Sequence, residues 1–169
     1  MTTNDVQLKQ NRMVYYSAEA IASVNEVLDR LLELAGARQE LLVDVEGHLI
    51  TSRGTSSVAL NVDNVSALVA GTFAATKATA KQLGQEGFSV LFHQGEKDSI
   101  QLTLIDDRML LAIIFDQTTT IGMVRVYASE TAMRVSEIFT NNVGVTEESP
   151  LTEEFTDSVQ DKLDDVFNV

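Results

Sequence analysis

The chain of 169 residues has no cysteine and a single proline. Without cysteine it can form no disulfide, thiolate nucleophile or zinc–thiolate site, and nothing in it requires an oxidising compartment. Cationic residues are also scarce, because 12 Lys and Arg stand against 25 Asp and Glu, for a formal charge of −13. Charge of this sign and size repels nucleic acids and anionic membrane surfaces. We therefore expect no nucleic acid among the partners and no membrane insertion.

Long apolar runs are missing as well. The run from Met109 to Phe115 is far shorter than the roughly 20 residues that a helix needs to span a bilayer. The N-terminal sequence MTTNDVQLKQNRM lacks the hydrophobic core of a signal peptide. The simplest localisation is therefore cytoplasmic.

Catalytic motifs are absent in the same way. The sequence contains no G-x-x-x-x-G-K-[ST] phosphate loop, no G-x-S-x-G elbow and no H-E-x-x-H zinc motif. The two histidines, His48 and His93, fall at predicted turns, where we expect them to be exposed to solvent. Asp106 and Asp107 are adjacent turn residues with side chains in different directions, and Asp44 is expected to cap the following turn. We expect no catalytic residue, no metal and no cofactor, and hence a protein that is not an enzyme.

The stretch from Lys97 to Val126 is predicted to form the central hairpin of the fold. Ile100, Leu102 and Leu104 alternate with polar residues, as in a half-buried strand. After a turn at Asp106, the uninterrupted apolar run to Phe115 suits a strand covered on both faces. Such a sheet needs helices on both sides, so the sequence predicts a small α/β domain.

The other elements follow from periodicity and from turn residues. A helix with apolar residues three and four apart begins at Ser17, a good N-cap, and stops at Gly36. A last helix is predicted up to Asn142 with Thr118 or Thr119 as its cap, although its β-branched start also resembles a strand. The predicted order is a helix to Gly36, strands at 41–45 and 49–52, a polar loop at 53–60, a helix at 63–83, a strand at 88–92, the central hairpin, and a helix at 121–142.

The two sides of the helix at 63–83 differ in kind. One side is predicted to face the core and holds Val65, Leu68, Val69, Thr72, Phe73, Thr76, Thr79, Ala80 and Leu83. The other side is nearly flat and holds Ala67, Ala70, Gly71, Ala74, Lys77, Ala78 and Lys81. Two interpretations stay open here. Alanine is the best helix former and these positions can simply face water, or the small side chains form a docking face for another backbone.

The segment from Thr146 to Val169 differs from the rest of the chain. It has eight acidic residues against Lys162 alone, a net charge of −7, and Pro150 near its start. A disordered solubilising tail and an amphipathic helix that orders against a basic groove, on the protein itself or on a partner, are both compatible with this pattern. The apolar residues at helical spacing, which are candidates for partner binding, are Leu151, Phe155, Val159, Leu163, Val166 and Phe167.

Several short motifs, in this order, resemble the Roadblock family of dynein light-chain-like proteins, and its MglB-type bacterial branch in particular. The first is the hairpin LVDVEGHLI from Leu42 to Ile50. The others are LVAG at 68–71, AA at 74–75, AK at 80–81, LG at 83–84, FHQGEKDS at 92–99, IFD at 114–116 and IGMVR at 121–125. The resemblance covers about residues 17–142, and the acidic C-terminus also resembles that branch.

This resemblance implies a five-stranded antiparallel sheet with helices on both faces (α-ββ-α-βββ-α) and a homodimer joined through its sheets and second helices. It implies a flexible arm at 1–16, a Roadblock domain at 17–145 and an acidic tail at 146–169. Proteins of the MglB type stimulate GTP hydrolysis by MglA, a Ras-like small GTPase, in cell polarity or gliding motility at the cell poles. The second helices lie at the GTPase-binding surface, which implies that Ala70, Gly71, Ala74 and Ala78 are at or near the contact.

The resemblance also implies activation without an inserted arginine finger. Transition-state charge can be stabilised by an arginine of the GTPase itself, so that a partner has only to favour the right switch conformation. Arg53, expected in a loop, is the one arginine worth testing as a finger. Two rival functions remain: a Roadblock scaffold that binds a GTPase or motor complex without activating it, and a small-molecule sensor, disfavoured by the lack of a convergent polar cluster.

Overall fold

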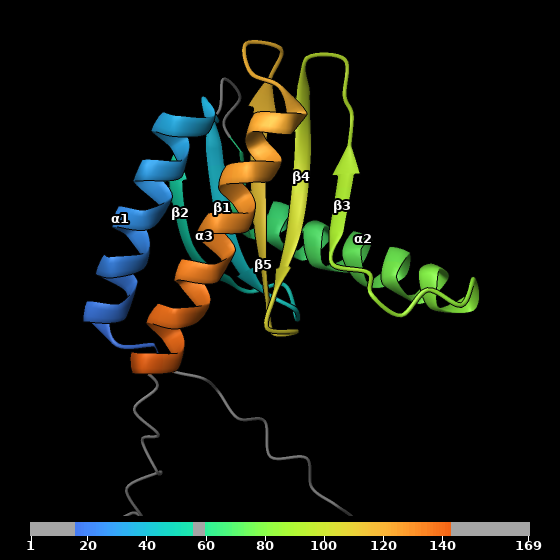
Figure 1. Cartoon of the computed structure of the whole chain (residues 1–169), viewed down its shortest axis with the longest axis horizontal. Coiled ribbons are helices and arrows are strands. Elements are labelled where there is room, and N and C mark those ends of the chain that lie inside the picture. The colour runs from blue at the N-terminus through green and yellow to red at the C-terminus, as the bar shows by residue number, and fades with distance from the viewer. Residues whose placement is uncertain (1–15, 56–59, 143–169) are drawn as a thin grey trace, which may run out of the picture.

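A computed structural model describes residues 16–55 and 60–142 of the chain. A five-stranded antiparallel sheet forms the middle layer, with strand order β2-β1-β5-β4-β3. Helices α1 and α3 cover one face of this sheet and α2 runs across the other (Figure 1). The predicted α/β (α+β) class and the order of elements are thus confirmed. The elements are α1 (Ala18–Ala35), β1 (Gln39–Asp44), β2 (Leu49–Gly54), α2 (Val62–Gln82), β3 (Val90–His93), β4 (Asp98–Ile105), β5 (Met109–Asp116) and α3 (Ile121–Asn142).

Strand β5 lies at the centre of the sheet, between β1 and β4. Every residue from Met109 to Phe115 is buried, which confirms the prediction of a strand covered on both faces. Successive side chains alternate between the layers, so Leu111 and Ile113 meet the α1–α3 layer while Leu110 and Ala112 meet the α2 layer. Two apolar cores therefore lie on opposite sides of one strand.

The turn between β4 and β5 consists of Asp106, Asp107 and Arg108, as the sequence predicts. Asp106 and Asp107 have φ angles of 51° and 54°, in the left-handed region that aspartate tolerates better than most residues. Two consecutive residues of this kind are typical of tight hairpin turns, because their twist matches that of the strands. Ile105 and Met109 pair directly across the turn.

The ends of the two long helices on the α1–α3 side are set by local hydrogen bonds. Ser17 accepts a bond of 3.1 Å from the Ala20 N–H, and Gly36 ends α1 at a φ of 63°. Helix α3 has the predicted bounds, but its first turn is capped by Thr120, whose hydroxyl accepts from the Met123 N–H. Thr118 instead donates to Asp116 in the preceding turn, so the prediction of Thr118 or Thr119 as the cap was wrong.

Several other boundaries differ from the sequence predictions, among them β1, which covers Gln39–Asp44 and not 41–45. Tyr16, the last residue of the expected arm, packs its ring 4.2 Å from the Phe139 ring, measured between centroids, and so joins the core. Arg53 lies in β2 and not in a loop, because β2 continues to Gly54 opposite Gln39 of β1. Strand β3 begins at Val90 and not at Phe88. In the part of the chain that the structure describes, no helix has the length and apolar character needed to cross a membrane.

Candidate functional site

Among the described residues, α2 is the one helix that covers its face of the sheet. The residues that α2 buries against the sheet determine which of its residues face outward. The Asn61 side chain caps the helix by accepting from the Asn64 N–H at 3.1 Å. Phe73 lies in the core and its ring contacts that of Phe88, with the centroids 5.2 Å apart. The buried residues of α2 are Ser66, Val69, Ala70, Phe73 and Ala80.

The sequence prediction assigned some of the wrong residues to this buried side of the helix. Leu68 and Leu83, expected in the core, are 69% and 75% exposed, whereas Ala70, expected on the docking face, is 4% exposed. The reason is the approach of the β1–β2 turn. A Cβ at Gly47, where φ is 99°, would lie 3.0 Å from the Ala67 Cα and 3.6 Å from the Ala70 Cβ. The small size of Ala70 therefore serves internal packing, and Ala70 drops out of the docking face.

Lys77 makes an ion pair within the domain. Its Nζ donates to Asp107 Oδ1 at 2.8 Å, which ties the middle of α2 to the β4–β5 turn. This exposed ion pair adds little stability, but it occupies the lysine that the sequence placed on the docking face. Of the predicted face, the exposed members are Ala67, Gly71, Ala74, Ala78 and Lys81.

The exposed residues of the outer face of α2 between Asn64 and Lys81 carry no charge. Thr76 and Thr79 donate their hydroxyls to carbonyls of their own helix, those of Thr72 and Ala75, at 2.9 and 3.0 Å, which lowers their need for water. A Cβ added at Gly71 would meet no atom within 4 Å, so this glycine faces outward. The exposed residues between Asn64 and Lys81 are Ala67, Leu68, Gly71, Thr72, Ala74, Ala75, Ala78 and Thr79.

The free edge of the sheet continues this surface. Strand β3 pairs with β4 on one side and with no strand of the described chain on the other. Val90 on β3 is exposed, as is Leu83 at the end of α2. In Figure 1 the C-terminal end of α2 extends past β3, beyond the cover of the sheet. An open edge with exposed apolar side chains is a typical place for another chain to pair.

Comparison with known proteins identifies the family. Residues 23–115 match the Roadblock/LC7 domain. The chain belongs to the Roadblock/LC7 family. No curated protein matches the sequence.

Among solved structures, this Roadblock domain is similar to MglB. The Myxococcus xanthus MglB is 36% identical over 70% of this chain and 95% of that one, with a TM-score of 0.66. The gliding protein MglB of Thermus thermophilus is 31% identical over 76% and 96%, with a TM-score of 0.69. A structure described as MglB with a tetrameric arrangement is 30% identical over 76% and 96%, with a TM-score of 0.70.

Arg53 of this Roadblock domain is held in a defined ion pair. Its Nε and Nη2 donate to the two carboxylate oxygens of Asp29 on α1, at 2.6 and 2.7 Å. These hydrogen bonds hold the pKa of Asp29 below its usual value and raise the pKa of Arg53. A finger would have to break both bonds before it could reach a partner, so the geometry gives Arg53 a structural task.

The β1–β2 turn holds the only grouping of three potential metal ligands in the described residues. Asp44 accepts from the His48 N–H and approaches His48 Nδ1, both at 2.8 Å, so it caps the turn as predicted. These contacts raise the pKa of His48. Asp44, His48 and Glu46 place ligand atoms within 4.8 Å of one another, which is sufficient for a cation. Exposed carboxylates commonly gather in turns without a metal, so the grouping does not alter the expectation of no metal.

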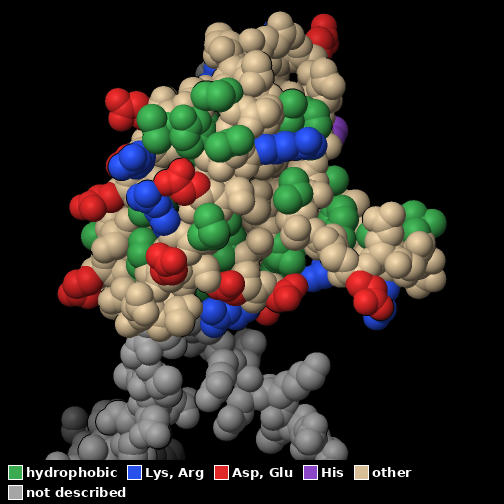
Figure 2. All heavy atoms as spheres, in the orientation of Figure 1, with side chains coloured by type: hydrophobic (Ala, Val, Ile, Leu, Met, Phe, Trp, Pro, Cys, Tyr) green, Lys and Arg blue, Asp and Glu red, His purple; other side chains and the backbone are tan. Residues whose placement is uncertain are grey.

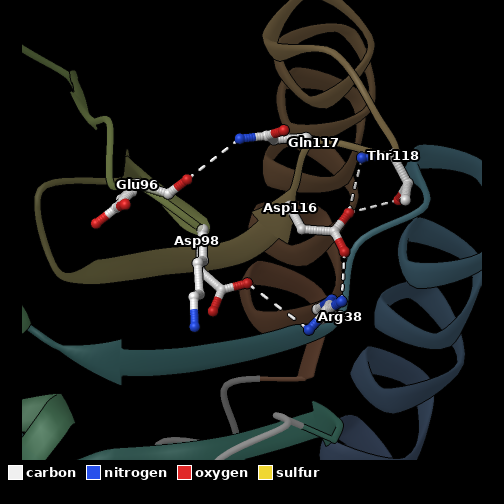
Figure 3. A pocket seen from close by; sticks show the side chains of 7 residues that line it. Arg38, Glu96, Asp98, Asp116, Gln117 and Thr118 are labelled. Carbon is white, nitrogen blue, oxygen red and sulfur yellow. Dashed lines mark hydrogen bonds and ion pairs between the residues drawn. The ribbon is translucent and has the colours of Figure 1, made fainter.

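A polar cavity of about 330 Å³ lies at the end of the sheet, in a place that sequence reasoning missed. Figure 3 shows Arg38 between Asp98 and Asp116, which come from the start of β4 and the end of β5. Hydrogen bonds from Thr118, and then the contact with Arg38, lower the pKa of Asp116. The ion pairs of Arg38 with Asp98 and Asp116 join the junction after α1 to two strand ends. The pairing of β4 with β5 brings these residues together, so neighbouring positions in the sequence do not reveal the cavity. The one local sign of it is the pair of Asp116 and Thr118, two residues apart.

The predicted tail residues, from Leu151 to Phe167, lie outside the described residues. The candidate site is therefore the outer face of α2 with the neighbouring β3 edge. It offers shape and apolar contact, because its exposed residues between Asn64 and Lys77 are small, apolar or uncharged.

Proposed function

We propose that this Roadblock protein regulates a Ras-like small GTPase of the MglA type, and that it stimulates GTP hydrolysis as a homodimer without an arginine finger. The observation that carries the proposal is the 30–36% identity to MglB chains over nearly their whole length. The Thermus relative is described as a gliding protein, and we extend this role in motility and polarity, at the cell poles, to the present chain.

The outer face of α2 is the proposed contact for the GTPase. Between Asn64 and Lys81 its exposed side chains are uncharged and mostly small, so a partner can approach closely with little desolvation of charge. The contact residues are Ala67, Gly71, Ala74, Ala78 and Lys81, with Leu68 as the one large apolar side chain. In the homodimer, two β3 edges and two α2 helices come together and present these faces as one platform.

Phosphate release from the partner GTPase, measured with and without this protein, tests the proposal. We expect acceleration that saturates with the concentration of this protein, because the dimer favours the switch conformation that places the GTPase's own catalytic groups. The absence of acceleration at saturating protein, with binding intact, would instead leave a non-activating scaffold.

Arg53→Ala separates the two mechanisms of activation. Loss of an arginine finger lowers hydrolysis by roughly 10³-fold or more. We expect the rate at saturating protein to stay within about twofold, because Arg53 is engaged with Asp29. A loss in the range of a missing finger would overturn the mechanism proposed here while leaving GTPase regulation in place.

A further inference from the structure

An apolar surface lies on the face of the molecule that is turned away from α2. Leu34 of α1 and Met123, Val126 and Met133 of α3 are all exposed, and Val126 and Met133 reach 64% and 61%. Leu34 also lines a shallow cleft between the two helices, whereas Met123, Val126 and Met133 lie on α3 outside the lining of that cleft. Figure 2 shows apolar patches beside charged side chains over this layer. We call the cleft with these four residues the α1–α3 seam. The cleft is lined by Val27, Arg30, Leu31, Leu34, Tyr127, Glu130, Thr131 and Arg134.

The cleft has a positive charge balance in a strongly acidic protein. Arg30 and Arg134 stand against Glu130, which accepts from Arg134 at 2.7 Å. Arg30 makes no ion pair with any residue that the structure describes. The chain as a whole carries a charge of −13, so this cleft is a local exception, and an acidic segment with apolar residues would complement it.

The chain itself contains such a segment, and it starts beside the seam. Residues 143–169 follow directly on Asn142, the last residue of α3. Within them, 146–169 has a charge of −7 and apolar residues at helical spacing. As a helix, residues 150–167 would measure about 27 Å, which matches the roughly 28 Å of α3 between Asn142 and Met123.

The spacing of the apolar residues on α3 also agrees with their spacing in the C-terminal segment. Met133, Val126 and Met123 are separated by seven and three residues along α3. In the opposite direction, Phe155, Leu163 and Val166 are separated by eight and three. An antiparallel helix that returns along α3 would therefore place Phe155 near Met133 and Leu163 near Val126, because both helices rise 1.5 Å per residue.

We infer that residues 150–167 fold back onto the α1–α3 seam of the same chain, with their apolar side over Met133, Val126, Met123 and Leu34 and their carboxylates towards Arg30 and Arg134. The α1–α3 layer and α2 lie on opposite faces of the sheet, so the docked segment leaves the outer face of α2 open. The inference is thus independent of the proposed GTPase contact.

Disulfide trapping in the full-length protein tests this docking, since the native chain contributes no competing thiol. We expect Val126→Cys with Leu163→Cys to form an intramolecular disulfide under mild oxidation, because a disulfide needs Cα atoms within about 7 Å. The matched control is Leu68→Cys with Leu163→Cys, since Leu68 is 69% exposed but lies on the opposite face. The Val126 pair should react roughly tenfold faster or more, because docking raises the effective concentration of its partner thiol.

Equal rates for the two pairs would overturn the inference and return the segment to a solubilising or partner-binding role. Disulfides formed only between two copies would overturn docking within one chain. Arg30→Glu with Arg134→Glu, in the Val126 pair, should slow trapping about tenfold by charge repulsion. An unchanged rate in a variant with native circular dichroism would overturn the choice of this seam.

Discussion

Glu40 lies in the middle of β1 with its side chain fully buried, and both carboxylate oxygens lack a hydrogen-bond partner in the described part of the chain. Burial, and then the nearby charge of Asp29, raise the pKa of Glu40 to about 9. Arg53, opposite Glu40 in the β1–β2 pairing, is engaged with Asp29 and so does not neutralise it. The carboxyl is therefore protonated in the folded protein at neutral pH.

This protonation makes stability depend on pH in a defined direction. The folded pKa is raised, so the contribution of Glu40 is fully present below pH 4.5 and is lost as the pH rises towards 9. Glu40→Gln cannot ionise, so it should match the native protein near pH 4.5 and be more stable by on the order of 3 kcal/mol at pH 7. Chemical unfolding at pH 5, 7 and 8.5 measures this gap. Glu33→Gln on the exposed side of α1 is the control, and a gap that does not widen with pH would contradict the prediction.

At the scale of the element, α3 and α2 show what periodicity can and cannot predict. The bounds of α3 came out as predicted because Val124, Ala128, Val135 and Phe139 keep helical spacing on one buried stripe. In α2 the same reasoning placed Leu68 inside, because a leucine outweighs an alanine in any pattern of apolarity. The structure buries Ala70 instead, because the close approach of the β1–β2 turn depends on size and not on hydrophobicity.

The exposure of the outer face of α2 was largely readable from the sequence, because five of the seven residues assigned to the flat side are exposed. Gly71, Ala74 and Ala78 are exposed as predicted, because they lie far from the buried stripe. A small error in the predicted orientation of the helix therefore leaves them exposed. The engagement of Lys77 with Asp107 had no local signal, because the two residues are 30 positions apart and only the hairpin turn brings them together. The same holds for the Arg38 junction at the end of the sheet.

Long, positively charged side chains on the outer face of α2 should block the proposed GTPase contact. Ala74→Arg with Ala78→Arg adds two exposed side chains that a flat partner surface cannot accommodate, so the affinity should fall roughly 100-fold or more. Titration calorimetry with the GTPase measures this. Ala18→Arg with Ala22→Arg on α1 has the same spacing and exposure and should bind normally. If both variants bind like the native protein, the contact lies elsewhere.

At the scale of the whole molecule, the two faces of the sheet are covered unequally. In the described residues, two helices cover one face and only α2 covers the other, where Leu91, Ile100 and Leu104 are partly buried. Together with the unpaired β3 edge, this incomplete cover supports the proposed homodimer, because pairing would bury apolar area that the single chain leaves exposed.

Charges at this edge should separate the two copies. Leu83→Glu with Val90→Glu places like charges on exposed positions of α2 and β3, so we expect the mass in sedimentation to halve while the circular dichroism stays native. Val126→Glu with Met133→Glu makes the same change on the α1–α3 side and should leave the mass unchanged. A native mass in the first variant would place the interface on another surface.

The position of β5 has a consequence for the synthesis of the protein. β5 is the last strand in the sequence and the central strand of the sheet, so the β2–β1 pair and the β4–β3 pair meet only through it. While the chain emerges from the ribosome, the β1–β2 hairpin and α2 have no complete sheet to pack against until Asp116 has been synthesised. Folding therefore waits for contacts between distant parts of the chain, and a nascent chain that stops before β5 exposes apolar surface that chaperones recognise.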